Sequence, residues 1–309
     1  MVYFKFGAKI VIFSHITLYY RSKKSDFICL LKESGCSLNI FLFSKPLSYL
    51  CIGKIKNYKD MNELIQQFQP ITLDEMKSIR LMNRMDTKFV TTRQKLISLL
   101  EMALQDYRIQ EINGERNMEY DTTYFDTRQF DMYYDHQYGH SNRQKIRFRT
   151  YVSSDLQFME VKTKNNHGRT KKKRMEVTDM NLADSTKRQF LAEHLRFEVD
   201  SLIPALNNHF KRITLVNSAK TERLTIDSDL CFNNLITGEH KDMGKLVIIE
   251  LKRDGLCYSP VLEMLQELHI HPHGFSKYCM GSALTNSELK INRFKPNIID
   301  INKIMAQAV

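Results

Sequence analysis

The 309-residue sequence has no Cys-x-x-Cys pair, no apolar run long enough to cross a membrane and no Gly-rich linker after residue 60. Its six cysteines are scattered, which argues against a disulfide framework or a structural zinc site and predicts a reducing, cytoplasmic location. Apolar runs such as IVIF and NIFLF are far shorter than the roughly 18 residues of a spanning helix. The N-terminus lacks a small-residue cleavage site, so it does not indicate a signal peptide.

Positive charge is present in excess but is unevenly distributed. The formal net charge is +11, and residues 1–60 hold ten Lys/Arg against three Asp/Glu. In the remaining sequence the excess is concentrated between Arg143 and Arg174, where eleven Lys/Arg accompany two acidic residues. This local cluster predicts a polyanionic partner that binds at one place on the protein.

Residues 1–60 differ in character from the rest of the chain. They are rich in aromatic residues, Ser and Lys and show no sustained period of two or 3.6 residues. We expect Met61 to be the natural start and residues 1–60 to be an extension that arises from an upstream start assignment. The alternative is a basic segment that binds a membrane surface or a partner. Residues 61–309 are expected to form one domain.

From Met61 onward, strand patterns outnumber helix patterns. Thr72-x-x-Glu75 and Thr91-x-x-Gln94 predict two helix starts, and further helices are expected at about 183–195, 201–210, 260–268 and after Ser276. Eight strands are predicted, at 85–90, 119–126, 145–151, 156–164, 169–177, 212–217, 222–230 and 245–253. Strands in successive hairpins favour an α+β fold on an antiparallel sheet.

Charged residues recur at every second position of several predicted strands. One run has a cation at each alternate position from Lys145 to Arg149, and the next has charged residues at alternate positions from Glu160 to Lys164. Rows of like charge repel across an antiparallel pair unless an anion lies between them. Two solvated sheet faces are the simpler explanation. A barrel that turns the charged face inward would instead create an anion site, in which cations bind phosphates and carboxylates hold a metal.

Seven short runs then resemble the motifs of one family. RMDTKF, YDTTYFDT, KIRFRTY, FMEVKTK, ERLTID, VIIELK and GFSKYCMG are similar, in this order from about Leu81 to Leu284, to motifs of the vacuolar transporter chaperone (VTC) domain. That domain is the polyphosphate polymerase branch of the triphosphate tunnel metalloenzymes. The resemblance implies an eight-stranded antiparallel β-barrel tunnel, capped by helices. It also implies transfer of the γ-phosphoryl group of ATP to polyphosphate, or to water in related branches.

The resemblance also assigns roles to individual residues. The implied catalytic, phosphate-binding cations are Lys88, Arg147, Arg149, Lys162, Arg223 and Lys277. The further predicted substrate contacts are Lys145, Lys164 and Ser276. Glu250 is the implied ligand of a divalent metal, Mn²⁺ or Mg²⁺, with Glu160 assisting. Tyr124 and Arg143 are expected only as neighbours in the lumen.

The sequence departs from the family pattern at the first strand. The wider superfamily often has Glu-x-Glu-x-Lys there, whereas Asp86-Thr87-Lys88 keeps a single acid, which leaves fewer carboxylates for a metal. A further basic residue is usual before the ERLTID strand, and Lys220 is the candidate for it. The membrane helices of eukaryotic VTC complexes have no counterpart, so a membrane-associated partner would be another chain.

Several alternatives remain open at the level of sequence. A triphosphate or polyphosphate hydrolase and a non-catalytic polyphosphate-binding protein would both use the same fold. Nucleic acid is not the expected partner, because the basic strands carry aliphatic rather than aromatic neighbours, although Lys171–Arg174 also fits a nucleic-acid patch. The histidines of HIHPHG and the tyrosines of DMYYDHQYGH are predicted to lie in loops.

Overall fold

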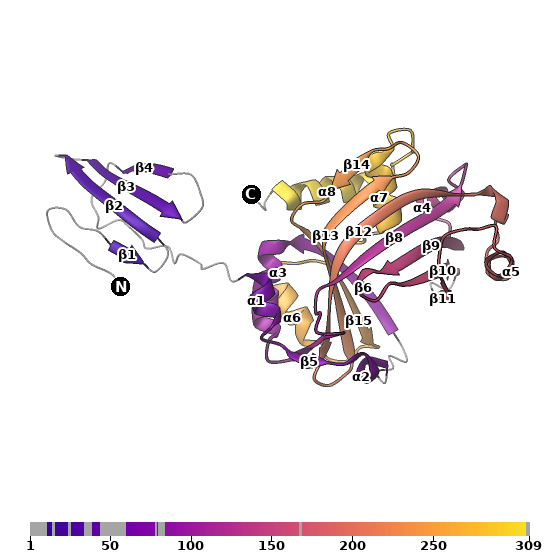
Figure 1. Cartoon of the computed structure of the whole chain (residues 1–309), viewed down its shortest axis with the longest axis horizontal. Helices are drawn as coiled ribbons and strands as arrows, with labels where there is room; N and C mark the ends of the chain where they lie inside the picture. The colour runs from indigo at the N-terminus through magenta and orange to yellow at the C-terminus, as the bar shows by residue number, and fades with distance from the viewer. Residues whose placement is uncertain are drawn as a thin grey trace. The chain divides into compact units, whose positions relative to one another are not determined.

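The computed structural model describes residues 60–77, 79, 84–166 and 169–306, and four strands before them. The chain divides into two compact units, Met1–Tyr58 and Lys59–Val309. The first contains an antiparallel sheet in the order β1 (Val11–Phe13), β2 (Ile16–Lys23), β3 (Asp26–Glu33) and β4 (Asn39–Phe43) (Figure 1). The sequence pattern did not predict these strands. The start at Met61 remains a prediction.

The second unit is built on a curved antiparallel sheet with eight strands along its main path. Their order is β11 (Thr170–Val177), β10 (Leu156–Lys164), β9 (Arg143–Tyr151), β8 (Met118–Thr127), β12 (Leu202–Asn217), β13 (Glu222–Asn234), β15 (Leu246–Asp254) and β6 (Arg84–Thr92). These strands correspond one to one to the eight predicted from the sequence. Three short strands extend the sheet: β14 (His240–Asp242) pairs with β13, and β5 (Gln69–Ile71) pairs in parallel with β7 (Tyr107–Gln110), which pairs with β12.

The expected closed barrel is wrong in one respect. Among the described residues no ladder of hydrogen bonds joins β6 to β11, so the sheet curves round a lumen without closing. β11 carries four consecutive cations, Lys171 to Arg174, and β6 begins with Arg84, so pairing these edges would place like charges opposite each other. The free edge of β6 is covered instead by a loop, in which Pro272 pairs with Phe89 and the His273 N–H donates to the Lys88 carbonyl (2.7 Å).

The two faces of the sheet have opposite character, as the alternation in the sequence predicts. The outward side chains of β12, β13 and β15, among them Ile213, Ile226 and Ile249, are at most 1% exposed. They form a core with helices α1 (Met61–Ile65), α3 (Arg93–Ala103) and α6 (Pro260–Glu267). Full burial of such a side chain contributes about 1.5–3 kcal/mol. A second outward core under α5 (Ser185–His194) includes Phe148 and Val161. The polar residues of the same strands therefore face inward.

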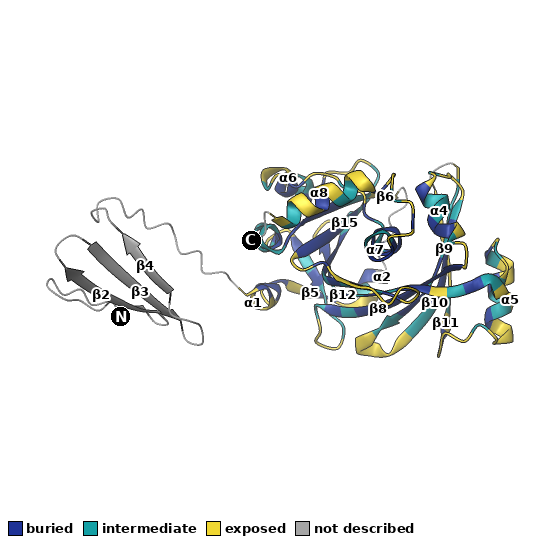
Figure 2. Ribbon diagram, turned by 90° about the horizontal axis from the view of Figure 1, so that it is seen from above, coloured by how far each residue is buried: buried dark blue, intermediate teal, exposed yellow. Residues whose placement is uncertain are grey.

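Eight α-helices surround the sheet within the described residues. They are α1 (Met61–Ile65), α2 (Leu73–Lys77), α3 (Arg93–Ala103), α4 (Asp131–Gln137), α5 (Ser185–His194), α6 (Pro260–Glu267), α7 (Lys277–Thr285) and α8 (Lys295–Ala306). Two short 3₁₀ helices lie at Val152–Ser154 and Val199–Ser201. Figure 2 shows α7 in the middle of the curve of the sheet. It thus fills one part of the lumen and leaves the rest for a site.

Local helix signals in the sequence were correct in part. Thr72 and Glu75 form the predicted reciprocal cap of α2, and the Ser276 hydroxyl accepts from the Cys279 N–H at the start of α7. α3 is capped by Thr92 rather than by Thr91. Two predictions are wrong: residues 202–210 belong to strand β12 instead of a helix, and the tyrosine-rich segment expected as a loop forms α4.

Helix α7 approaches the sheet closely at a glycine. A Cβ atom on Gly281 would lie 2.5 Å from the Leu206 and Phe232 side chains. We expect Gly281→Ala to lower the free energy of unfolding by about 1–3 kcal/mol through overpacking, measured by urea denaturation. Gly274→Ala is the control, because its Cβ would have nothing closer than 3.9 Å. Equal stability of the two variants would contradict close packing of α7.

Candidate functional site

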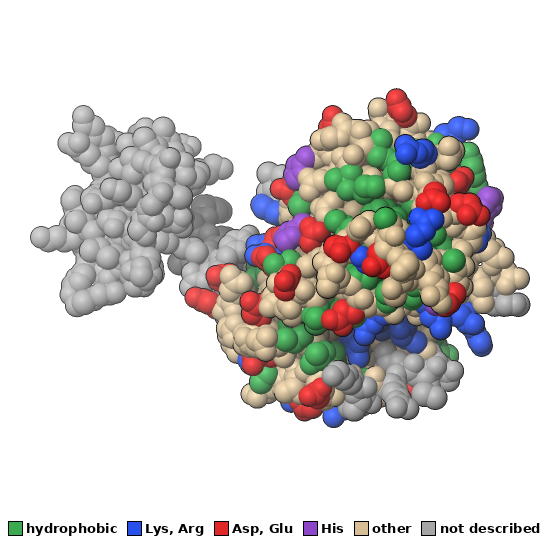
Figure 3. Space-filling view, turned by 45° about the vertical axis from the view of Figure 1, so that its right-hand side comes forward, with side chains coloured by type: hydrophobic (Ala, Val, Ile, Leu, Met, Phe, Trp, Pro, Cys, Tyr) green, Lys and Arg blue, Asp and Glu red, His purple; other side chains and the backbone are tan. Residues whose placement is uncertain are grey.

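A cavity of about 1100 Å³ occupies the concave side of the sheet, beside the start of α7. Figure 3 shows Lys and Arg side chains gathered in a hollow of the surface. Ten of the eleven predicted site residues line the cavity: Lys88, Lys145, Arg147, Arg149, Lys162, Lys164, Arg223, Glu250, Ser276 and Lys277. The structure therefore brings together residues that are up to 189 positions apart in the chain, from Lys88 to Lys277.

The cavity is strongly cationic. Of the described residues that line it, fourteen are Lys or Arg and three are Asp or Glu. Such an excess in a concave wall focuses a positive potential, because the low-dielectric protein screens the charges less than water does. The interior is therefore suited to a ligand with several negative charges close together.

Arg147 is held in place by a buried carboxylate. Glu160 is 1% exposed, and its oxygens accept from Arg147 (2.7 Å to Nε) and from Lys172 (2.8 Å to Nζ). Burial raises the pKa of Glu160, but Arg147 and the other cations outweigh this effect and hold it at about 2. Both oxygens are thus used inside the wall, which does not support the assisting role in metal binding expected for Glu160. The residue positions Arg147.

A second buried carboxylate, Asp227 on β13, was not among the predicted site residues. It accepts two hydrogen bonds from Arg212 (2.6 and 2.8 Å) and one from Lys277. The Phe210 ring lies under the same cations, with Lys277 Nζ at 4.1 Å and Arg212 Cζ at 5.2 Å from its centroid. The available signal was the alternation of Arg223, Thr225 and Asp227 along the predicted strand 222–230, which places Asp227 on the polar face.

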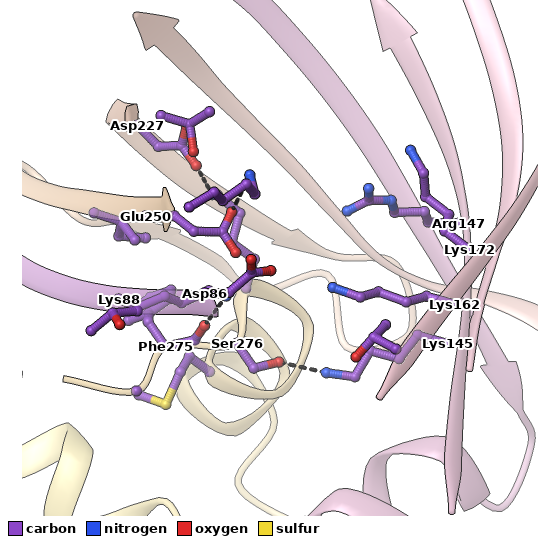
Figure 4. Close-up of a pocket in the computed structure, with 18 of the residues that line it drawn as sticks. Asp86, Lys88, Lys145, Arg147, Lys162, Lys172, Asp227, Glu250, Phe275 and Ser276 are labelled. Atoms are coloured by element: carbon purple, nitrogen blue, oxygen red, sulfur yellow. Dashed lines mark hydrogen bonds and ion pairs between the residues drawn. The ribbon is translucent and has the colours of Figure 1, made fainter. Parts of the chain in front are cut away.

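Two lysines tie the loop before α7 to the strands. Lys88 Nζ donates to the Phe275 carbonyl (2.9 Å), and Lys145 Nζ donates to the Ser276 hydroxyl (2.7 Å). Figure 4 shows the second of these bonds reaching across from β9. The loop therefore joins opposite sides of the lumen where the sheet itself does not close. Arg149 is positioned deeper, where its Nε donates to Thr122 (3.2 Å).

The remaining carboxylates on the lumen face are Glu250, which forms an ion pair with Lys252 (3.0 Å), and Asp86, whose two oxygens bind Arg84 (2.7 and 3.2 Å). In the register of β15 with β6, Glu250 lies opposite Lys88 and Lys252 lies opposite Asp86. The two acids are therefore diagonal neighbours on the lumen face (Figure 4). No group of three His, Cys, Asp or Glu converges on one point in the described part of the chain. Two carboxylates fit Mg²⁺ or Mn²⁺, because such ions take one or two protein ligands together with phosphate oxygens and water.

Charge and burial change the pKa values of the cavity residues. Removal from bulk water, followed by Lys88, lowers the pKa of Lys162 to about 8. Burial also lowers the pKa of Lys277 to about 8, despite its bond to Asp227. Burial raises the pKa of Tyr124, but Arg147 and Arg149 outweigh it and bring the value to about 8. All three groups therefore change charge in one narrow pH range.

These pKa values predict how binding depends on pH. In the ligand-free protein, Lys162 and Lys277 lose their protons as the pH rises through about 8. A bound polyanion favours the charged lysines, so binding takes the protons up again. ATP affinity is expected to be constant near pH 7 and to fall above pH 8, by up to about tenfold per pH unit for each lysine. The γ-phosphate stays ionised there, because the second pKa of a phosphate is about 6. Calorimetric titration with ATP and a metal chelator measures this.

Lys162→Met is the control for the pH dependence, because it removes one of the two titrating lysines. Its affinity at pH 7 should be lower, and its decline between pH 8 and 9.5 should be less steep. An unchanged affinity of the unmodified protein up to pH 9.5 would show that neither lysine contacts the phosphates.

Three other residues singled out in the sequence differ in whether they line the cavity. Lys220 is an exposed turn residue with φ of 58°, and it does not line the cavity. Lys172 lines the cavity, as expected for alternate residues of Lys171–Arg174, and His273 of HIHPHG lines it too. In the described part of the chain, no helix has the length and hydropathy needed to cross a membrane.

The part of the chain that forms this cavity matches a known family. The VTC domain matches residues 83–286 of the chain, which include every residue of the predicted site. The chain belongs to the VTC domain family. VTC domains are part of the triphosphate tunnel group, whose members bind nucleoside triphosphates or polyphosphate and generally use divalent metals. No curated protein matches the sequence.

Solved structures also match this chain, at low sequence identity and low TM-score. A candidate adenylate cyclase from Vibrio parahaemolyticus has 12% identity and a TM-score of 0.37, covering 63% of this chain and 97% of its own. One from Bacillus halodurans has 14% identity and a TM-score of 0.37, with coverage of 69% and 99%. A Hippeastrum protein described as having dominant triphosphatase activity has 13% identity and a TM-score of 0.41, with coverage of 66% and 97%.

Proposed function

We propose that this VTC-domain protein is a polyphosphate polymerase, which transfers the γ-phosphoryl group of ATP to a polyphosphate chain with the help of a divalent metal. The observation that carries the proposal is the cavity of about 1100 Å³ lined by fourteen Lys/Arg and three Asp/Glu. Both substrates of this reaction are polyanions, and both have to lie in the same cavity. Each phosphate needs cationic partners to compensate for lost hydration.

The reaction is an in-line displacement at phosphorus. A terminal oxygen of the acceptor chain forms a bond to the γ-phosphorus, and the bond from this phosphorus to the β,γ-bridging oxygen breaks, which releases ADP. The acceptor oxygen is already ionised near neutral pH, because the second pKa of a phosphate is about 6. The protein therefore needs no general base, and its contribution is positioning and charge stabilisation.

The cavity cations differ in how firmly hydrogen bonds to the cavity wall hold their side chains. Arg147, fixed by Glu160, and Arg149, fixed by Thr122, hold the phosphates in a set geometry. Lys162 extends freely into the cavity, and Lys88 and Lys277 lie near the loop that covers β6. Arg223 lies farther along, where its Nη2 donates to the Met76 carbonyl (3.3 Å). Together these cations would neutralise the triphosphate and the charge that develops during transfer.

Glu250, with Asp86 beside it, would hold the divalent metal. Such an ion would supply Lewis-acid stabilisation of the negative charge on the transferring group. Burial raises the pKa of Glu250, but Lys252 and Lys88 outweigh this and hold it well below the usual range. The carboxylate is therefore ionised and ready to bind a cation throughout the neutral pH range.

Incubation of the full chain with ATP and Mn²⁺ tests the proposal. The products are resolved on a polyphosphate gel, and free phosphate is assayed in parallel. A ladder of long chains is expected. Free phosphate without chains would reassign the protein as a hydrolase. If neither product forms, a non-catalytic polyphosphate-binding protein becomes the better assignment.

A further inference from the structure

One end of the cavity holds cations that are unlike those of the triphosphate site. Arg143 and Lys164 are direct neighbours across β9 and β10, at the end where β9 begins. Arg293 lines the same cavity but lies after the VTC match, which ends at residue 286. His136 of α4 lies among them: burial, followed by Lys145, Arg143, Arg293 and Lys164, lowers its pKa to about 2. Four cations therefore converge on a neutral imidazole.

Arg293 is carried by a segment that is firmly attached to the domain. The Tyr133 hydroxyl donates to the Lys290 carbonyl (3.0 Å), and Asn297 Nδ2 donates to the Gly274 carbonyl (2.6 Å). The guanidinium lies against Gly139, where a Cβ atom would be only 2.5 Å from Arg293 Nη1. A glycine at that position thus leaves the space that Arg293 occupies.

No carboxylate from the described residues lines this end of the cavity. The three acidic lining residues, Asp86, Asp227 and Glu250, belong to β6, β13 and β15. Arg143 donates to a main-chain oxygen, that of His140 (2.9 Å), and Asp135 on α4 binds Arg196 and His140 instead. Several cations held together without a compensating acid repel each other, and an anionic ligand removes that repulsion.

The opposite end of the cavity has a different composition. There Arg84 binds Asp86 (2.7 Å) and Lys252 binds Glu250 (3.0 Å), so two of the cations at this end already have acidic partners. Tyr120, Tyr151 and Gln110 also line that end. Aromatic rings and an amide suit a nucleoside better than a row of phosphates. The two ends thus differ in the kind of ligand that they favour.

We propose that Arg143, Lys164 and Arg293 form a second polyanion subsite, which holds the part of a polyphosphate chain that extends beyond the triphosphate site. From Arg149 to Arg143 strand β9 advances about 20 Å, at roughly 3.4 Å per residue, which is longer than a triphosphate. This subsite rests on the proposed function for its ligand, inorganic polyphosphate. It requires binding alone, so it is independent of whether the protein polymerises or hydrolyses.

The test compares ligands of different length on the full chain at pH 7.5 without metal. Affinities for tripolyphosphate, ATP and a long polyphosphate are measured for the unmodified protein, Arg293→Gln, Arg143→Gln and the control Lys295→Gln, whose side chain is exposed and does not line the cavity. Each of the first two variants is expected to bind the long chain roughly tenfold more weakly, with tripolyphosphate affinity unchanged. The slope of log K against log salt should fall by about 0.7–0.9 for the long chain.

Three other outcomes would overturn the subsite. Equal loss for both ligands would place Arg293 in the triphosphate site, and a weaker affinity for ATP alone would place the nucleoside at this end. Loss of thermal stability without any change in binding would make Arg293 a structural partner of α4. If the unmodified protein binds long polyphosphate but no turnover occurs, the proposed polymerase fails while the subsite stands.

Discussion

Glu250→Gln is expected to reduce turnover of ATP by at least about a thousandfold, which corresponds to roughly 4 kcal/mol of transition-state stabilisation. The amide has the shape of the carboxylate but lacks the charge that would hold a divalent metal. Binding of polyphosphate without metal should remain within about threefold of the unmodified protein, because Glu250 contributes no positive charge to it. Activity with Mn²⁺ and metal-free binding are measured on the same preparations.

The matched control for this variant is Glu239→Gln, which changes an exposed glutamate outside the cavity and should leave both quantities unchanged. The ion pair of Glu250 with Lys252 is also lost in the variant, so the thermal midpoint is recorded as a check on folding. Loss of binding in parallel with activity would show that Glu250 supports the cavity wall and is not a metal ligand.

Arg147→Ala is expected to weaken ATP binding by about thirtyfold and also to destabilise the fold. The binding loss follows from removal of a guanidinium that would contact phosphate, worth roughly 2 kcal/mol. The destabilisation follows from Glu160, which is 1% exposed and would keep Lys172 as its remaining ion-pair partner. Removal of one partner from a buried ion pair lowers the free energy of unfolding by about 3–5 kcal/mol. Calorimetry and urea unfolding measure the two effects.

A double variant separates these two contributions. In Arg147→Ala with Glu160→Gln, the buried carboxylate is neutral, so most of the lost unfolding free energy should return while ATP affinity stays low. Recovery of affinity together with stability would mean that Arg147 acts only on the fold. Arg128→Ala, at an exposed position away from the cavity, should alter neither quantity.

The prediction from sequence failed where long-range contacts outweighed local preference. Residues 202–210 have apolar residues at helical spacing, yet they pair with β8 on one side and with β13 on the other. The ladder with β8 shifts register between Pro204 and Leu206, which accommodates a proline without a backbone donor. Two neighbouring strands therefore determined the conformation of a segment whose own pattern favoured a helix.

Helix α4 was missed for a related reason. The N–H groups of its second and third residues, Met132 and Tyr133, donate to the carboxylate of Asp126 at 2.9 Å each. Asp126 is buried at the end of β8, too far upstream to be recognised as a capping residue. The turn between them places Phe130 at a φ of 59°, a conformation that no local rule assigns to phenylalanine. The helix start thus depends on a strand.

The sequence by itself determined the eight strands and the separation of their faces, because alternation along a strand is a local property. The family resemblance in its motifs also named ten residues that line the cavity. Tertiary structure alone decided whether the sheet closed, because closure depends on the charges of two edges that are far apart in the chain. It also decided that Glu160 positions Arg147 and that Asp227 joins Arg212 to Lys277. These ion pairs depend on which strands become neighbours, and alternation within one strand does not contain that information.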